Sequence, residues 1–334
     1  MNKNNKIAIL GAGMWGRTLA VLLAKNDVKI HLWDIRSDLD NELADFYKRM
    51  QSNGHPMSST PIFDQNIKDA CENADLIFCV LPAESVRDVF KNAKKVIPDN
   101  CPVVIATKGI EERESGFSMM SDIVRDSLGE TTQVGVLSGP NLSLEIQARH
   151  PAVSLIASEN ETLIKTVMEL LSSKIFRVYG SHDIIGVQIG GAVKNIIALA
   201  AGMVDELGFE FNTKAALLTR GLAEIARLGE KLGGNKDTFA GISGLGDLIC
   251  TASSPTSRNY RAGRLFGVGK KRDVIIEEIG QVIEGISTSR SVYNLVMSLG
   301  IEMPICKGVY YVVWEDKNPL QEISELMTRD LKFE

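Results

Sequence analysis

Near the start of the sequence, an apolar run, Lys6-Ile7-Ala8-Ile9-Leu10, leads directly into the glycine-rich stretch Gly11-Ala12-Gly13-Met14-Trp15-Gly16. Such a run is typical of a buried parallel strand, and the apolar residues at 19–23 fit a helix that packs on a sheet. Glycines with G-x-G-x-x-G spacing between a strand and a helix allow a tight turn and let the backbone approach a diphosphate. The free N–H groups at the helix start then hold that diphosphate. The stretch therefore predicts a dinucleotide-binding turn; a glycine turn without a ligand is the less favoured interpretation.

The next apolar run supports this prediction. Residues 28–33 are mostly apolar and include the β-branched Val28 and Ile30, and Asp34 follows them. An acidic residue about 20 positions beyond the glycines is where a dinucleotide fold holds the ribose hydroxyls. Asp34 therefore favours NAD and repels a 2′-phosphate, whereas Arg36 would favour that phosphate. An exposed charged loop is the alternative for both residues.

The composition is that of an ordinary globular protein: 334 residues, 44% hydrophobic and 24% charged. This length allows two domains. The net charge of −5 predicts no nucleic-acid surface, and no apolar stretch is expected to reach the length of a membrane span. Residues 1–6 leave no room for a signal peptide. Five scattered cysteines without a C-x-x-C pair indicate free thiols, a cytoplasmic location and no metal site.

Apolar runs continue through the first half of the chain. They predict strands at residues 75–80, 102–107 and 134–137, and the runs at 153–157 and 175–178 extend the expected sheet. Strands that alternate with helices predict a parallel sheet with right-handed crossovers. Ligands of such sheets bind beyond the carboxyl ends of the strands. We therefore expect an α/β dinucleotide-binding domain over residues 1–188.

No buried strand is predicted beyond residue 188. A long apolar helix is expected at 189–207 and a second helix at 213–232, followed by helices near residues 275, 288 and 309. The glycine-rich stretch at 241–247 is expected to be a loop. Residues 189–334 are therefore predicted to form an all-helical domain.

Lys194 is the candidate for chemistry in this half, because a lysine inside an apolar helix is costly unless it has partners. A lysine that reaches water from a buried face is the alternative. Because Gly190-Gly191 is expected to begin the helix, its dipole and burial should both lower the pKa of Lys194. Asp247 is a candidate counter-charge, and Arg258 and Asn259 offer donors suited to a phosphate.

Seven motifs, in order along nearly the whole chain, resemble those of the bacterial, cytoplasmic NAD(P)-dependent glycerol-3-phosphate dehydrogenases. They are Gly11-x-Gly13-x-Trp15-Gly16, Lys108-Gly109, Leu137-Ser138-Gly139-Pro140, Gly191-Ala192-Val193-Lys194-Asn195, Gly244-Leu245-Gly246-Asp247-Leu248, Ser257-Arg258-Asn259 and Val282-Ile283-Glu284-Gly285.

The resemblance implies a Rossmann domain followed by a helical domain like that of 6-phosphogluconate dehydrogenase, with the active site between them, and a homodimer without stable membrane insertion. It implies reversible reduction of dihydroxyacetone phosphate to sn-glycerol 3-phosphate for phospholipid synthesis, with Lys194 as general acid/base. The substrate residues would be Lys108, Gly139, Asn141, Lys194, Asn195, Asp247, Ser257, Arg258 and Asn259. The cofactor residues, with Asp34 and Arg36 from the spacing above, would be Gly11, Gly13, Met14, Trp15, Gly16, Lys108, Ser143, Arg258, Val282 and Glu284.

The chain departs from the family pattern at several positions. Met14 replaces a usual serine, Asn141 a serine or threonine, and Ser143 an alanine; Asp34 takes a place that is often small, and Ile35 one that is often Arg or His. These departures bear on the choice between NAD and NADP, and NAD is slightly favoured. Two other functions stay open: a hydroxy-acid dehydrogenase of the same superfamily, and a non-catalytic dinucleotide sensor.

Overall fold

The computed structural model describes residues 5–113 and 116–331 and divides into two compact units. The first unit comprises residues 1–108 and 118–184, and the second comprises residues 109–117 and 185–334. The division thus falls at residue 184, close to the expected position, but the short segment 109–117 groups with the second unit. The expectation about a signal peptide rests on residues 1–6, of which residues 1–4 lie outside the described residues.

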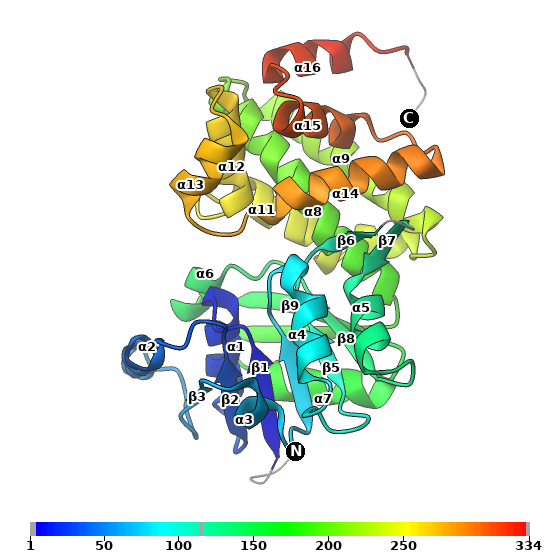
Figure 1. Ribbon diagram of the computed structural model, residues 1–334. Helices are drawn as coiled ribbons and strands as arrows, with labels where there is room; N and C mark the ends of the chain where they lie inside the picture. Colours follow the sequence, from blue (N-terminus) through cyan, green and yellow to red (C-terminus); the bar gives the residue numbers. More distant parts are fainter. Residues whose placement is uncertain (1–4, 114–115, 332–334) are drawn as a thin grey trace. The chain divides into compact units, whose positions relative to one another are not determined.

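The first unit is built on an eight-stranded sheet with the order β10-β9-β8-β5-β4-β1-β2-β3 (Figure 1). The strands are β1 (Lys6–Leu10), β2 (Lys29–Trp33), β3 (Ile62–Asp64), β4 (Leu76–Cys79), β5 (Val103–Ile105), β8 (Val134–Ser138), β9 (Ala152–Ser158) and β10 (Phe176–Ser181). Every predicted strand is confirmed, and β3 is an addition.

The sheet departs from the predicted parallel arrangement at one place, where β8 and β9 pair antiparallel. A parallel pair needs a connection that returns along the full length of the strand, usually through a helix. Between β8 and β9 the only helix is α6 (Ser143–Gln147), whose five residues span about 7.5 Å. The chain therefore turns back beside β8 in the opposite direction.

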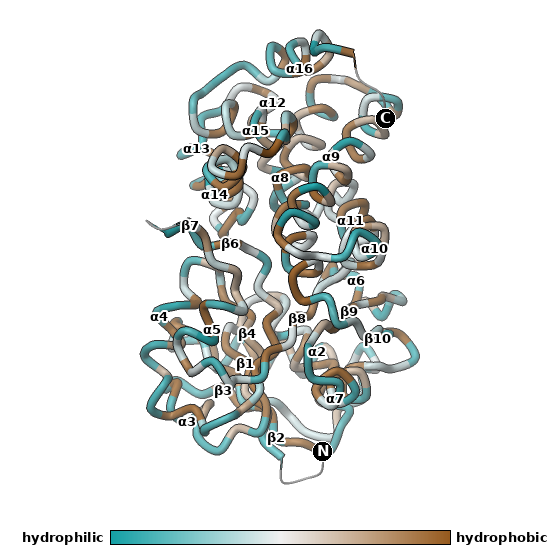
Figure 2. The backbone as a smooth tube through the Cα atoms, turned by 90° about the vertical axis from the view of Figure 1, so that its right-hand side faces the viewer, coloured by the Kyte–Doolittle hydropathy of each residue, from teal (hydrophilic) through white to brown (hydrophobic). Residues whose placement is uncertain are grey.

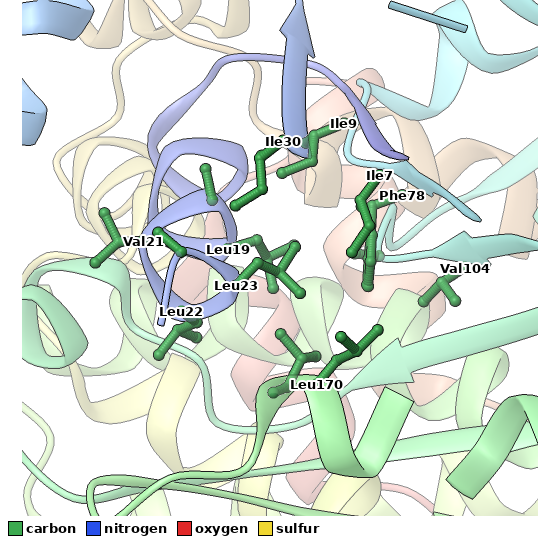
Figure 3. Packing of buried hydrophobic residues seen from close by; sticks show 14 of the residues in the cluster. Ile7, Ile9, Leu19, Val21, Leu22, Leu23, Ile30, Phe78, Val104 and Leu170 are labelled. Atoms are coloured by element: carbon green, nitrogen blue, oxygen red, sulfur yellow. The ribbon is translucent and has the colours of Figure 1, made fainter. Parts of the chain in front are cut away.

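Helices cover both faces of this sheet. On one side α1 (Met14–Leu23) packs with α2 (Asp40–Ser52), α6 and α7 (Glu161–Leu171), and on the other α4 (Val86–Ala93) packs with α3 (Ile67–Cys71) and α5 (Met120–Leu128). The apolar face of α1 lies against the central strands, where Leu19 and Leu23 meet Ile7, Ile9 and Phe78 (Figure 3). These side chains are fully buried, and each burial contributes about 1.5–3 kcal/mol. The hydrophobic colour of β1, β4 and β8 in Figure 2 marks the same core.

The second unit is helical, as predicted, apart from a hairpin that the sequence did not reveal. The hairpin of β6 (Ile110–Arg113) and β7 (Gly116–Met119) packs through β6 on α14 (Glu284–Leu299), where Glu112 accepts from Asn294 and pairs with Arg290. The helices are α8 (Ile184–Glu206), α9 (Phe211–Lys231), α10 (Lys236–Phe239), α11 (Asp247–Ser253), α12 (Arg258–Gly267), α13 (Arg272–Ile279), α14 (Glu284–Leu299), α15 (Pro304–Trp314) and α16 (Pro319–Met327).

Helix α8 corrects two expectations. It is long and apolar enough to cross a membrane by length and composition, contrary to the sequence reading, but 94% of its apolar window is buried inside the protein. It also begins at Ile184, so Gly190 and Gly191 lie within it and not at its start. A Cβ on Gly190 would lie 3.0 Å from the carbonyl oxygen of Ser243, so this glycine allows a close approach of two backbones.

Candidate functional site

The glycine turn between β1 and α1 has the geometry that its spacing predicts. Gly11 has φ of +109°, and a Cβ there would lie 2.5 Å from the carbonyl oxygen of Val80. A Cβ on Gly16 would lie 1.9 Å from the carbonyl oxygen of Gly11, so the start of the helix meets the end of the strand. A Cβ on Gly13 would meet nothing within 4 Å. The turn therefore encloses open space only at its second glycine.

The start of α1 is suited to an anion. Gly13 is the N-cap, no side chain caps this end of the helix, and its first turn holds no acidic residue. The first N–H groups of a helix have no partner within it and carry partial positive charge. A diphosphate beside Gly13 would satisfy them, so the residues present fit a dinucleotide. Met14 is exposed and Trp15 half-buried at the same place.

Asp34 lies beside this turn at the end of β2. Its carboxylate accepts from the backbone N–H of Ala12 at 2.9 Å and from Nε of Arg36 at 3.0 Å. Burial acts to raise the pKa of Asp34, but the hydrogen bonds from Arg36 and Ala12 outweigh it, and the net effect lowers the pKa. Asp34 is therefore ionised and already paired, whereas the guanidinium of Arg36 remains half exposed.

Three predicted substrate residues gather at the ends of β5 and β8. Lys108 donates through Nζ to the carbonyl oxygen of Gly139 at 3.1 Å. Asn141 donates to Ser154 at 3.1 Å, and its side-chain oxygen is buried without a donor among the described residues. Ser143 begins α6 two residues later. An amide oxygen left without a donor at a strand end supports a polar ligand there.

The second unit holds a buried ion pair. Lys194 and Asp247 form a salt bridge with side-chain exposures of 5% and 2%. Lys194 also donates to the hydroxyl of Thr251 at 2.5 Å, and that hydroxyl lies 3.3 Å from the same carboxylate oxygen of Asp247. The expected pairing of Lys194 with Asp247 is thus present in the structure.

The local structure explains how these side chains meet. Lys194 lies ten residues after the start of a 23-residue helix, so the expected effect of the helix dipole is absent, since it fades within the first turn. The stretch predicted to be a loop is instead a π-helical turn, Ile242–Gly246, that runs straight into α11. It places Asp247 at the start of α11 and Thr251 one turn later on the same face.

Sequence reasoning missed Thr251. Its spacing of four residues from Asp247 would have indicated it, had the segment been recognised as a helix.

Asn195 and Asn259 are also together. Asn259 donates to the side-chain oxygen of Asn195 at 2.9 Å and accepts from the backbone N–H of Gly285 at 2.9 Å. The amide of Asn259 thus ties helix α8, which carries Lys194, to the start of α14, a contact that the motif alone did not predict.

The remaining predicted residues lie at helix starts. The hydroxyl of Ser257 caps α12 by accepting from the N–H of Tyr260. Arg258, the first residue of α12, is exposed. Desolvation lowers the pKa of Arg258, and the charge of Glu284 at the start of α14 opposes this shift. Val282 is 38% exposed. Within the described ranges, no cluster of three or more His, Cys, Asp or Glu side chains suits a metal ion.

Comparison with known proteins agrees with this geometry. Family models match residues 6–164 (NAD-dependent glycerol-3-phosphate dehydrogenase N-terminus) and residues 183–324 (C-terminus of the same enzyme). A relative from Bacillus pumilus, glycerol-3-phosphate dehydrogenase [NAD(P)+], is 41% identical over 97% of this chain and 94% of its own. The crystal structure of glycerol-3-phosphate dehydrogenase from Coxiella burnetii is 35% identical with a TM-score of 0.89, covering 98% of this chain and all of that one.

Other dehydrogenases share the fold alone. A structure of D-mandelate dehydrogenase with NADH covers 97% of this chain and 100% of its own with a TM-score of 0.61, but only 14% of residues are identical. The assignment to a family rests on two observations. Two family models together span most of the residues, and relatives near 40% identity match over nearly the full length. This chain belongs to the family of NAD(P)-dependent glycerol-3-phosphate dehydrogenases.

Proposed function

We propose that this chain catalyses reversible hydride transfer between NAD(P)H and the central carbon of dihydroxyacetone phosphate. The observation that carries the proposal is the buried Lys194–Asp247 pair with Thr251 in the helical unit. Burying two charges is costly, and a hydrophobic pair of similar volume is often as stable. Because the chain belongs to a family of dehydrogenases, we assign the buried cation Lys194 a direct role in the reaction.

Lys194 stabilises the oxygen of the substrate carbonyl and delivers a proton to it from Nζ. A nicotinamide, when bound, would supply the hydride for reduction of the ketone and would accept it in the reverse direction. Negative charge develops on the carbonyl oxygen during reduction, and a fixed ammonium group stabilises that charge most effectively where water is excluded. Asp247 is the counter-charge of Lys194, and the hydroxyl of Thr251 fixes the direction of its N–H groups.

Arg258 is assigned to the substrate phosphate. Arg258 is the first residue of α12, and a guanidinium presents paired donors to phosphate oxygens. Ser257, Asn195 and Asn259 hold the surrounding helices in register through the hydrogen bonds described above. Lys108, Gly139 and Asn141 form the polar cluster that we assign to the substrate in the first unit.

The cofactor residues are proposed to be the glycine turn with Met14 and Trp15, and Asp34, Arg36, Lys108 and Ser143, together with Arg258, Val282 and Glu284. Open space at Gly13 and the uncapped start of α1 support the first group. The carboxylate of Asp34 is supported as the ribose partner by its place at the end of β2. We propose a preference for NAD, because Asp34 repels the 2′-phosphate of NADP. The preference is moderate, because Arg36 partly neutralises Asp34.

The family resemblance supports three further proposals. The enzyme acts in the cytoplasm without stable membrane insertion or binding to nucleic acid, supplies glycerol phosphate for phospholipid synthesis, and forms a homodimer. Light scattering of the purified protein tests the last of these; a mass of about 36.5 kDa in solution, that of one chain, would contradict it.

The activity is tested by oxidation of NADH and NADPH with dihydroxyacetone phosphate, dihydroxyacetone and small 2-keto acids. We expect the phosphate ester to be the preferred substrate. The Arg258→Ala variant should raise its KM by at least about tenfold, since a charged hydrogen bond is worth about 1.5–3 kcal/mol, while the KM for dihydroxyacetone changes little. Preference for a keto acid would favour the hydroxy-acid dehydrogenase, and no turnover with any ketone would favour a dinucleotide sensor.

A further inference from the structure

Ala12 lies between the first two glycines of the turn. Its backbone N–H and its backbone carbonyl oxygen both form hydrogen bonds with charged side chains. Its N–H donates to Asp34 at 2.9 Å, and its carbonyl oxygen accepts from Nε of Arg17 at 2.7 Å. Arg17 lies on α1, one turn after Gly13, and its side chain is 9% exposed. We call these two contacts the Ala12 clamp.

The clamp acts on the part of the chain with the greatest backbone freedom. Gly11 and Gly13 flank Ala12, and glycine loses more conformational entropy on folding than any other residue. Contacts on either side of Ala12 fix the two peptide groups that join it to these glycines. The conformation in which the N–H groups at the start of α1 point to the open space at Gly13 is thereby selected before a ligand arrives.

An arginine at position 17 carries an energetic cost that a contact needed only for folding would not require. A cation near the start of a helix is opposed by the helix dipole, and a buried guanidinium costs desolvation. Its only carboxylate partner in the described residues is Glu42 on α2, at 2.5 Å, and that side chain is 58% exposed. Arg17 holds the pKa of Glu42 below its usual value. A diphosphate at the helix start would add a second anion to this cation's surroundings.

We propose that Arg17 is a positioning residue for the cofactor: it fixes the glycine turn through Ala12 and places a buried positive charge behind the helix start that receives the diphosphate. This inference rests on the proposed cofactor site. Because the diphosphate is common to NADH and NADPH, Arg17 raises the affinity for both, whereas Arg36 distinguishes them.

Arg17→Met tests the proposal, since methionine keeps an apolar stem beside Phe46 and removes the guanidinium. We expect the dissociation constants of NADH and NADPH, measured by fluorescence titration, to rise together by about tenfold. The KM for dihydroxyacetone phosphate and kcat at saturating cofactor should stay within about twofold. Arg17→Lys, which keeps the charge and one donor, should recover part of the affinity.

Arg49→Met is the matched control. The guanidinium of Arg49 also lies over the ring of Phe46, at 5.8 Å against 6.0 Å for Arg17, but no contact joins it to Ala12. It should leave both dissociation constants unchanged. If Arg17→Met behaves like Arg49→Met, the proposal is wrong; if it lowers kcat and cofactor affinity alike, and Arg17→Lys recovers neither, Arg17 serves only the fold.

Gly13→Ala separates this proposal from the site assignment. A Cβ has room there in the protein itself, but it takes space proposed for the diphosphate. If Gly13→Ala leaves NADH binding intact, the cofactor site is misplaced. If Gly13→Ala weakens binding and Arg17→Met does not, only the role of Arg17 fails.

Discussion

Asp34 shows how one side chain can serve both the fold and the choice of cofactor. The sequence predicts that its carboxylate faces the ribose and repels a 2′-phosphate. In the structure it also accepts from Ala12 and Arg36. Removing its side chain would therefore loosen the glycine turn as well as remove a charge, so Asp34→Gly or Asp34→Ser would mix two effects.

Asp34→Asn separates the two effects, because the amide oxygen can still accept from Ala12 while the negative charge is lost. We expect wild type to favour NADH over NADPH in kcat/KM, and Asp34→Asn to shift this ratio toward NADPH by about tenfold, since a repulsive element is removed. Arg36→Ala should shift the ratio the opposite way. Steady-state kinetics with both cofactors decides it; a ratio unmoved by either change would show that neither residue reads the ribose.

At the scale of elements, α8 and α11 are joined by the Lys194–Asp247 pair, so loss of Lys194 also affects stability. Lys194→Met leaves the carboxylate of Asp247 buried without its cation, which costs about 3–5 kcal/mol. Lys194→Met combined with Asp247→Asn should restore most of that stability but not turnover, which should remain lower by at least about 10²-fold. Denaturant unfolding and kinetics of wild type and of these two variants test this. Turnover that returns with stability would remove Lys194 from the chemistry.

Helix α15 depends on a carboxylate from another helix. Glu224 of α9, 3% exposed, accepts from the backbone N–H of Ile305 at 2.8 Å and of Cys306 at 3.0 Å, at the start of α15. Burial raises the pKa of Glu224, and these hydrogen bonds only partly oppose it. The folded protein therefore binds this proton more tightly than the unfolded chain does.

The sign of the pH dependence follows from that difference. The unfolded pKa of Glu224 is about 4.3, and its folded pKa is higher. Between these two values the folded state binds more protons than the unfolded state, so the contribution of Glu224 to the stability of the fold is lost as pH rises. Glu224→Gln, which does not titrate, should therefore gain stability relative to wild type from pH 4 toward pH 7. Denaturant titrations at several pH values measure the gap. If the difference in the free energy of unfolding between Glu224→Gln and wild type narrows or stays constant over this range, burial does not destabilise the charged carboxylate.

The strands that the sequence does not predict are short and partly exposed. Strands β1, β4, β5 and β8 are predicted because buried parallel strands are continuous apolar runs. Strand β3 and the β6–β7 hairpin are short and partly exposed, so they carry no such run.

Gly190 and the π-helical turn differ from the prediction because they depend on each other. A glycine that lets two backbones approach cannot be told from a glycine that ends a helix until the partner, here Ser243, is known. The pairing of Lys194 with Asp247 was predictable from the cost of a buried charge; the contacts of Thr251, Asn259 and Arg17 depend on tertiary structure.

For the molecule as a whole, the proposed cofactor residues fall in both compact units: the glycine turn, Asp34 and Arg36 in the first, and Arg258, Val282 and Glu284 in the second. Hydrogen exchange with and without NADH tests this division. Bound ligand slows local opening of the segments that it contacts, so NADH should protect peptides covering residues 11–17 and 34–36 and, separately, those covering residues 282–285. The Gly13→Ala variant at the same NADH concentration should lose both protected regions together, because they report one bound molecule. Protection confined to the first unit would mean that Arg258 and Glu284 serve the substrate or the helix starts, and their assignment to the cofactor would be withdrawn.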